Sequence, residues 1–228
     1  MNAGNHTQII EMSANKARLF FLKPEHYVNF NLPKYITFEE ILKVAGEITK
    51  GKKQVSGICR IEEGHPVYPS RYLDVNYTVL SNKDGSFAWR PFQIIHPVLY
   101  IEMVNFITQD NNWEEIQDFF KQRNKTKIKC MSIPLESNTT ESDRAEQVNN
   151  WWDKVEQETL RLSLDYNFMY QTDISDCYGS IYTHSFEWAL ADGGRLKIKE
   201  DRKETGESPS NLGTEIDKRL QNMNAQQT

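Results

Sequence analysis

The sequence contains no long apolar run, no paired cysteines and no leader-like N-terminus, and each absence excludes a class of protein. No stretch approaches the roughly 20 apolar residues that span a bilayer. Residues 1–15 are polar and lack the basic and then apolar order of a secretory signal. The three cysteines, Cys59, Cys130 and Cys177, have neither metal-binding nor redox spacing. We therefore expect a cytoplasmic protein with reduced thiols and no membrane span.

Several catalytic motifs are absent as well. The sequence has no phosphate-binding glycine loop, no Gly-x-Ser-x-Gly nucleophile elbow and no zinc-ligand spacing. The pair Asp173 and Asp176 does not match the Asp-x-Asp arrangement of haloacid-dehalogenase-type phosphatases, which argues against an aspartyl-phosphate mechanism. His184 is a candidate base or metal ligand, but no second histidine or cysteine has ligand spacing with it, and helix capping or packing is the alternative.

Length and charge describe an ordinary globular protein with one basic segment. A chain of 228 residues is long enough to bury a core. Its composition, 38% hydrophobic and 26% charged, is that of an ordinary globular protein. The net charge of −5 argues mildly against a nucleic-acid partner, because phosphate contacts need Lys and Arg. Residues 121–129 nevertheless carry five cations and predict a local basic patch.

The hydrophobic pattern predicts an α+β chain. Helices are expected at 37–49 (with a Thr37–Glu40 capping box), 98–107, 112–120, 143–165, 183–190 and 212–223. Two strands are expected at 76–80 and 87–90, where they form a hairpin, and Pro91 is expected to end the second of them. Further strands are expected at 127–133 and 168–173. Residues 1–17 are expected to form a loose arm or short helix, and 51–70 and 191–210 to form loops. Trp151 and Trp152 on the long helix are candidates for core or interface packing or, alternatively, base stacking.

The most informative stretch runs from Tyr170 to His184. An apolar lead-in reaches Asp173, a turn-prone segment follows, and a helix is expected from about Thr183. A strand tip of this kind is a rigid mount for a carboxylate that binds a metal ion. The alternative is an aspartate that only caps the turn.

This stretch resembles motif A of reverse transcriptases, in which an aromatic residue follows the metal-binding aspartate. Tyr178 lies five residues after Asp173, and residues 181–185 are similar to the bacterial abortive-infection and defence-associated branch. His96-Pro97-x-x-Tyr100 is also similar to that branch. The resemblance implies two-metal nucleotidyl transfer with Mg²⁺, in which Asp173 is the catalytic metal ligand and the carbonyl of Ile174 completes the metal shell.

The resemblance also implies substrate contacts. Tyr178 would exclude the 2′-hydroxyl of a ribonucleotide, and the backbones of Asp176 and Cys177 would contact the triphosphate. Lys83 and Arg90 resemble the basic fingers hairpin that holds phosphates. The alternatives are a Tyr178 packed in the core, an Asp176 that caps the turn, and a surface hairpin with solvated cations.

The resemblance divides the chain into an arm at 1–30, a fingers-like region at 31–165, and the start of a palm at 166–228 with a mobile loop at 191–210. The other catalytic carboxylates of the family do not follow, so we expect no activity from the chain alone. We also expect either self-association or a partner that supplies the missing palm. The predicted function is an RNA-directed DNA polymerase fragment, in antiphage defence, that acts on nucleic acid and deoxynucleoside triphosphates. The alternative is a non-catalytic module that binds nucleic acid or protein through residues 121–129 and the Trp151–Trp152 helix.

Overall fold

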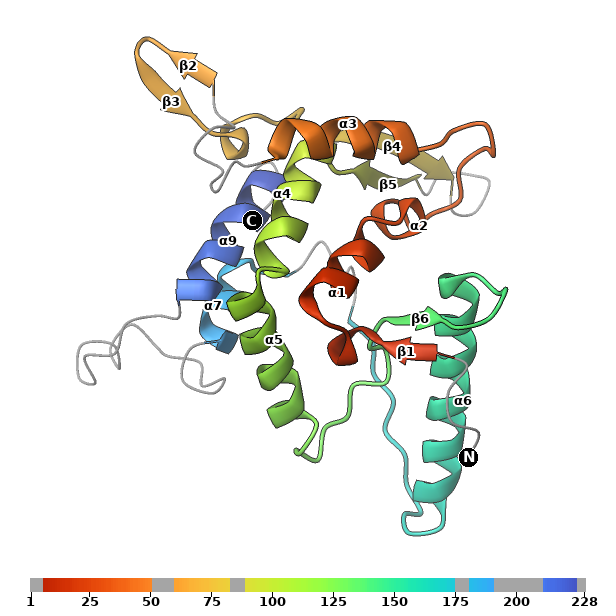
Figure 1. The fold of residues 1–228 in the computed structure, drawn as a ribbon. Helices are drawn as coiled ribbons and strands as arrows, with labels where there is room; N and C mark the ends of the chain where they lie inside the picture. Colours follow the sequence, from red (N-terminus) through yellow and green to blue (C-terminus); the bar gives the residue numbers. More distant parts are fainter. Residues whose placement is uncertain (1–5, 51–59, 83–88, 175–180, 191–210, 225–228) are drawn as a thin grey trace, which may run out of the picture. The chain divides into compact units, whose positions relative to one another are not determined.

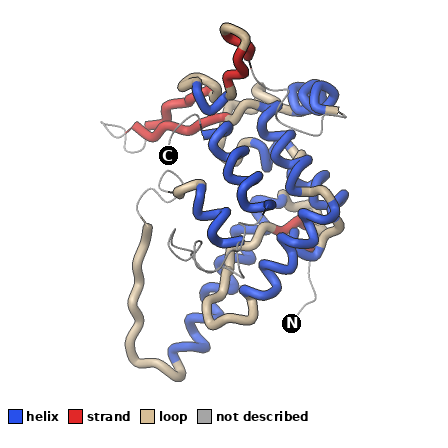
Figure 2. Tube along the Cα trace, turned by 90° about the vertical axis from the view of Figure 1, so that its left-hand side faces the viewer, coloured by secondary structure: helices blue, strands red, loops and turns tan. Residues whose placement is uncertain are grey.

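The computed structural model describes residues 6–50, 60–82, 89–174, 181–190 and 211–224 (Figure 1). The chain forms two compact units, each made of two separate stretches of sequence. Unit 1 comprises Met1–Phe21 and Thr108–Ser175, and unit 2 comprises Leu22–Ile107 and Asp176–Thr228. Helices and short two-stranded sheets make up both units (Figure 2), so the predicted α+β class is confirmed at this level. This division interrupts the predicted fingers-like region at Ile107.

The helices and strands are divided between the two units as follows, in chain order within each unit. Unit 1 contains β1 (His6–Gln8), η1 (Ile9–Glu11), α1 (Ala14–Phe21), α5 (Asp110–Arg123), β6 (Leu135–Ser137) and α6 (Asp143–Ser163). Unit 2 contains α2 (Pro24–Tyr27), α3 (Glu39–Thr49), β2 (Arg60–Glu62), β3 (His65–Val67), η3 (Pro69–Arg71), β4 (Tyr77–Asn82), β5 (Trp89–Ile94), α4 (Pro97–Ile107), α7 (His184–Leu190) and α9 (Asn211–Asn224).

The core of unit 1 forms where the N-terminal segment packs on α5. Met12, Phe20 and Trp113 are buried together. The indole Nε1 of Trp113 donates a hydrogen bond to the carbonyl of Met12 at 2.9 Å, and Gln117 Nε2 donates to the same carbonyl at 2.9 Å. Of the two expectations for 1–17, the loose arm was wrong for the described residues, and the short helix is present as the first part of α1. The N-terminal segment supplies four of the five buried residues of this core, although residues 1–17 show no clear periodicity.

The sheet of unit 1 pairs one strand from each of the two stretches of sequence that form the unit. β1 runs antiparallel to β6, with His6 opposite Ser137 and Gln8 opposite Leu135 (Figure 1). The strand predicted at 127–133 is absent, and Ile128 is exposed. Alternating polarity marks a segment that can form a strand, but a strand also needs a partner, and β1 pairs with residues 135–137 instead.

Helix α6 begins where the sequence predicts. Ser142 is its N-cap, and the Ser142 side chain accepts a hydrogen bond from the backbone N–H of Ala145. Trp151 and Trp152, however, are 38% and 61% exposed. Core packing of these two rings within unit 1 is therefore wrong, and they contact each other edge to face with centroids 4.9 Å apart.

The strand predicted at 168–173 is also absent. After α6 the chain continues without regular structure, and Phe168 and Tyr170 are more than nine-tenths exposed. None of the described strands pairs with this segment, and a β-prone sequence becomes a strand only when it forms hydrogen bonds to a neighbouring strand. The expected palm strand that carries Asp173 was therefore wrong for the described chain.

The predicted hairpin is present in unit 2. β4 and β5 pair antiparallel, and the register places Leu80 opposite Pro91 and Ser81 opposite Arg90. Pro91 was expected to end the second strand, but β5 continues to Ile94. Both strands of a two-stranded sheet are edge strands, so the missing N–H of a proline is tolerated there.

The helices of unit 2 enclose a second core. Tyr27, Leu42, Ala45 and Ile101 are buried where α3 packs on α4, and the hydroxyl of Tyr27 donates a hydrogen bond to the carbonyl of Ile95. The predicted helix at 37–49 is confirmed, but it begins after Phe38 and has no side-chain cap. The Thr37–Glu40 capping box was therefore wrong.

Helix α9 packs against both α4 and α7, and Gly213 permits the close contact with α7. A Cβ atom at Gly213 would lie 2.7 Å from the Cα of Glu187. The residue must therefore be glycine for the two helix backbones to approach this closely.

We predict that Trp113→Ala strongly destabilises unit 1. The substitution removes the largest buried side chain of this core and its hydrogen bond to Met12, so the free energy of unfolding should fall by about 3–5 kcal/mol. Urea unfolding measures this change. Trp152→Ala is the matched control, since that ring is mostly exposed, and it should change stability by less than about 1 kcal/mol. Equal losses in both variants would contradict the assignment of Trp113 to the core.

Two glycine substitutions should have opposite effects. Gly213→Ala inserts a methyl group against the backbone of α7 and should lower the melting temperature. Gly46→Ala, in the middle of α3 with open space around its Cα, should raise the stability by about 0.5–1 kcal/mol through helix propensity. Thermal unfolding followed by circular dichroism compares the two, and a stabilising Gly213→Ala would refute the close contact between α7 and α9.

Candidate functional site

Asp173 and Ile174 lie in the irregular segment after α6. Both are exposed, and the backbone N–H of Ile174 donates a hydrogen bond to Asp173 Oδ1 at 2.8 Å. This short-range bond orients one carboxylate oxygen, and the other remains accessible from solvent. Among the described residues, Asp173 belongs to no group of three or more potential metal ligands.

The other predicted site residues are only partly described. Lys83, Asp176, Cys177 and Tyr178 lie outside the described residues. Arg90 is exposed on β5 in unit 2, opposite Ser81. Its position on a hairpin is the predicted one, and its role toward phosphate stays a prediction.

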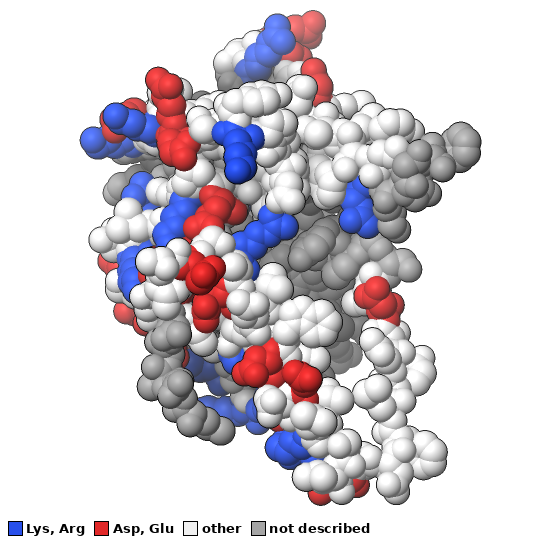
Figure 3. Space-filling model, turned by 90° about the vertical axis from the view of Figure 1, so that its right-hand side faces the viewer, with Lys and Arg blue, Asp and Glu red and all other residues white. Residues whose placement is uncertain are grey.

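The basic segment at 121–129 is not a uniform patch. Lys121 pairs with Asp118 at 3.2 Å, Lys129 donates to the carbonyl of Asn124, and the guanidinium of Arg123 lies over the ring of Phe119. Basic and acidic side chains are also intermixed on the face of the molecule in Figure 3. Several cations of this segment thus have local partners, which weakens the argument for a nucleic-acid surface there.

His96 and Tyr100, which the sequence singled out at the start of α4, have structural contacts. The backbone N–H of His96 donates to Asn76 Oδ1 at 3.1 Å, and its carbonyl accepts from the backbone of Tyr100. Burial lowers the pKa of His96 and raises that of Tyr100, because each charged form is desolvated. These backbone contacts give His96 a structural place at the start of α4.

Helices α7 and α9 bring together three side chains that can bind a metal ion. His184 and Glu187 lie three residues apart on α7, and Asp217 lies on α9. One nitrogen of His184 and one carboxylate oxygen from each of the two acids lie within 4.8 Å of one another. His184 Nδ1 is 2.5 Å from Asp217 Oδ2. The sequence identified His184 but missed Asp217, because the two belong to separate helices and no local spacing relates them.

The carboxylate of Asp217 is unevenly satisfied. Its side chain is 5% exposed, and Oδ2 accepts a hydrogen bond from Gln221 Nε2 at 3.0 Å as well as contacting His184. Oδ1 is buried with no hydrogen-bond partner among the described residues. A buried carboxylate oxygen in this condition is unusual, since buried polar atoms in folded proteins are nearly always bonded.

A second buried charge lies two residues further along α9. The guanidinium of Arg219 contacts Glu102 Oε1 at 3.0 Å and Glu215 Oε2 at 2.8 Å, and it lies 3.6 Å from the centroid of the Phe106 ring. The Arg219 side chain is 4% exposed. The ion pair with Glu102 joins α9 to α4, so the positive charge of Arg219 stabilises the packing of these two helices. Burial raises the pKa of Glu102, although the nearby Arg219 acts in the opposite direction.

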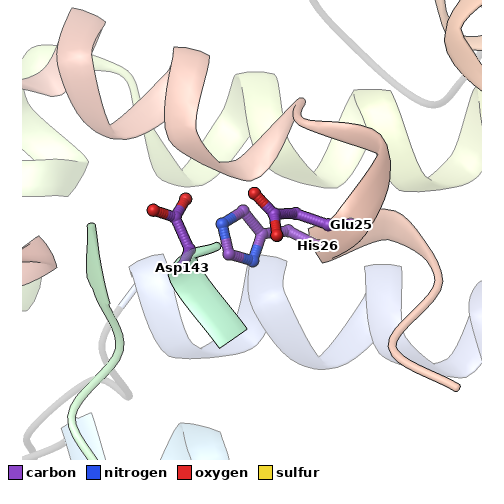
Figure 4. Close-up of side chains that lie close together, drawn as sticks. All are labelled: Glu25, His26 and Asp143. Atoms are coloured by element: carbon purple, nitrogen blue, oxygen red, sulfur yellow. The ribbon is translucent and has the colours of Figure 1, made fainter. Parts of the chain in front are cut away.

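Two other titratable side chains are adjacent on α2. Figure 4 shows the carboxylate of Glu25 and the imidazole of His26 extending from the same short helix of unit 2. Asp143, also labelled there, begins α6 in unit 1 and accepts a hydrogen bond from the backbone N–H of Ser137 at 2.8 Å. That bond joins α6 to β6 and gives Asp143 a structural role within its own unit.

The raised pKa of Glu102 predicts a dependence of stability on pH. A carboxyl group with a raised pKa in the folded state contributes stability below its unfolded pKa, and this contribution is lost as pH rises through the folded value. The free energy of unfolding of the wild type should therefore fall relative to that of Glu102→Gln as pH rises above about 4.5. Urea unfolding at a series of pH values measures the difference. If the free energy of unfolding of the wild type instead rises relative to that of Glu102→Gln as pH increases, Arg219 outweighs desolvation.

None of the described helices is both long and apolar enough to cross a membrane.

Comparison of the sequence with models of known protein families gives no match, and no curated protein matches it either.

Proposed function

We propose that the chain is part of an RNA-directed DNA polymerase of the bacterial defence-associated type, in which Asp173 binds Mg²⁺. The observation that carries the proposal is the sequence from Asp173 to Ser185, in which an accessible aspartate precedes Tyr178 by five residues and a short helix follows. The exposed position of Asp173 supports it, because a carboxylate that binds the metal ion of a nucleotide must be open to solvent and substrate.

The proposed chemistry is two-metal nucleotidyl transfer. One Mg²⁺ activates the 3′-hydroxyl of the growing strand, and the other neutralises charge on the leaving phosphates. Asp173 and the carbonyl of Ile174 contribute ligands, and the ring of Tyr178 excludes ribonucleotides by contact with the 2′ position. The backbones of Asp176 and Cys177 face the triphosphate in this proposal.

The hairpin of β4 and β5 is proposed to hold phosphates through Arg90 and Lys83. The exposure of Arg90 supports this role, since a guanidinium that is free of the core can form two parallel hydrogen bonds to phosphate oxygens. Among the described residues, Asp173 belongs to no group of three or more potential metal ligands, so the proposed reaction requires further ligands from elsewhere. A partner or a further polypeptide segment is therefore part of the proposal.

One observation favours the alternative function of a binding module. Aromatic side chains are exposed along α6 and the segment that follows, including Trp152, Phe168 and Tyr170. Exposed aromatic rings can stack on unpaired bases or pack on a protein partner. This surface is compatible with the polymerase as well, because a nucleic-acid polymerase must hold its template.

We predict that Asp173→Asn abolishes DNA synthesis without affecting folding. The variant keeps the size of the side chain but removes the charge that binds Mg²⁺, so primer extension should fall by at least about 100-fold. The assay requires an assembly that supplies the further carboxylates, as a longer polypeptide or as a complex, and the chain alone should show no extension. Asp165→Asn, at another exposed aspartate of the same segment, is the matched control and should retain activity.

Tyr178→Ala in the same assembly should admit ribonucleotides. Comparison of deoxynucleotide and ribonucleotide incorporation by the wild type and the variant measures the selectivity. Wild-type synthesis by Asp173→Asn would remove the proposal, and unchanged selectivity in Tyr178→Ala would remove the assigned role of Tyr178 alone.

A further inference from the structure

The contact between α7 and α9 fixes a group of side chains with metal-binding chemistry inside unit 2. His184 and Glu187 share one face of α7, because residues three apart in a helix are neighbours. Gly213 brings the backbone of α9 close to Glu187, and Asp217 lies one turn further along α9. The close packing of α7 and α9 therefore holds the positions of these three residues near one another.

The donor set is typical of a transition-metal site. Imidazole nitrogen and carboxylate oxygen together suit Zn²⁺, Co²⁺ or Mn²⁺, whereas Mg²⁺ and Ca²⁺ prefer sites made of oxygen alone. The three ligand atoms lie within 4.8 Å of one another. A zinc ion at about 2.0–2.2 Å from each ligand needs them roughly 3.3 Å apart. Small rotations of the side chains are enough to reach that spacing.

An independent observation indicates that a cation belongs there. Asp217 is 96% buried, and its Oδ1 has no hydrogen-bond partner among the described residues. The two cations in α9 have other partners: Lys218 pairs with Glu215, and Arg219 pairs with Glu102 and Glu215. The carboxylate that contacts His184 through Oδ2 therefore has an unused, buried acceptor at Oδ1, and a cation bound by Asp217 would satisfy it.

We propose that His184, Glu187 and Asp217 bind one divalent transition-metal ion of the zinc type between α7 and α9. The ion binds where His184 Nδ1 and Asp217 Oδ2 contact each other at 2.5 Å, and these two atoms separate to become ligands. Its two positive charges balance the two carboxylates. The His184 side chain is 39% exposed, so water can reach the ion and complete its coordination.

This site is separate from the polymerase function proposed above, which places Mg²⁺ at Asp173. Its role is structural, because a metal ion bound by both helices stabilises their contact in the folded state and has no such set of ligands in the unfolded chain. Binding should therefore raise the melting temperature as the metal concentration increases.

Titration of the purified, metal-free chain with Co²⁺ tests the proposal. Visible absorption bands report coordination by nitrogen and oxygen, and we expect them to saturate at one equivalent and to disappear when Zn²⁺ is added. His184→Ala and Glu187→Gln should each weaken Co²⁺ binding by at least about tenfold, as should Asp217→Asn. Zn²⁺ should raise the melting temperature of the wild type but not that of these variants.

Two control variants make the result specific. His65→Ala removes an exposed imidazole on β3 and should leave Co²⁺ binding unchanged. Asp173→Asn should also leave it unchanged, so that failure of this site and failure of the polymerase proposal are distinguishable. If Asp217→Asn does not fold, the partly exposed positions His184 and Glu187 decide the test. The absence of Co²⁺ bands, or bands that His184→Ala leaves intact, would overturn the proposal and reduce the group to an ion pair.

Discussion

The structure of unit 2 depends on the burial of two opposite charges on α9. Arg219 and Asp217 are both almost fully buried, and an isolated charge in the protein interior is strongly unfavourable. Each must therefore find a partner on another helix, and Arg219 does so on α4 while Asp217 does so on α7. The two requirements together restrict how α9 can pack, in a way that apolar contacts alone would not.

The sequence predicted helices better than strands, because the information for a helix is local. The starts of α4 and α6 follow from Pro97 and from Ser142, because each of these residues acts on backbone groups within one turn. The strand β1 has no comparable signal, and its pairing with β6 joins residues about 130 positions apart. Such pairing depends on which segments meet in the folded chain, and the short polar stretch before Ile9 does not encode it.

The candidate sites differ in the same way. Asp173 and Tyr178 were identified because five residues separate them, and the flanking sequence strengthened the interpretation. The expected strand before Asp173 is absent, because a strand forms only when its backbone makes hydrogen bonds to a neighbouring strand. The partner of His184 was not identified at all, because Asp217 lies on a separate helix and its selection depends on the contact that Gly213 permits.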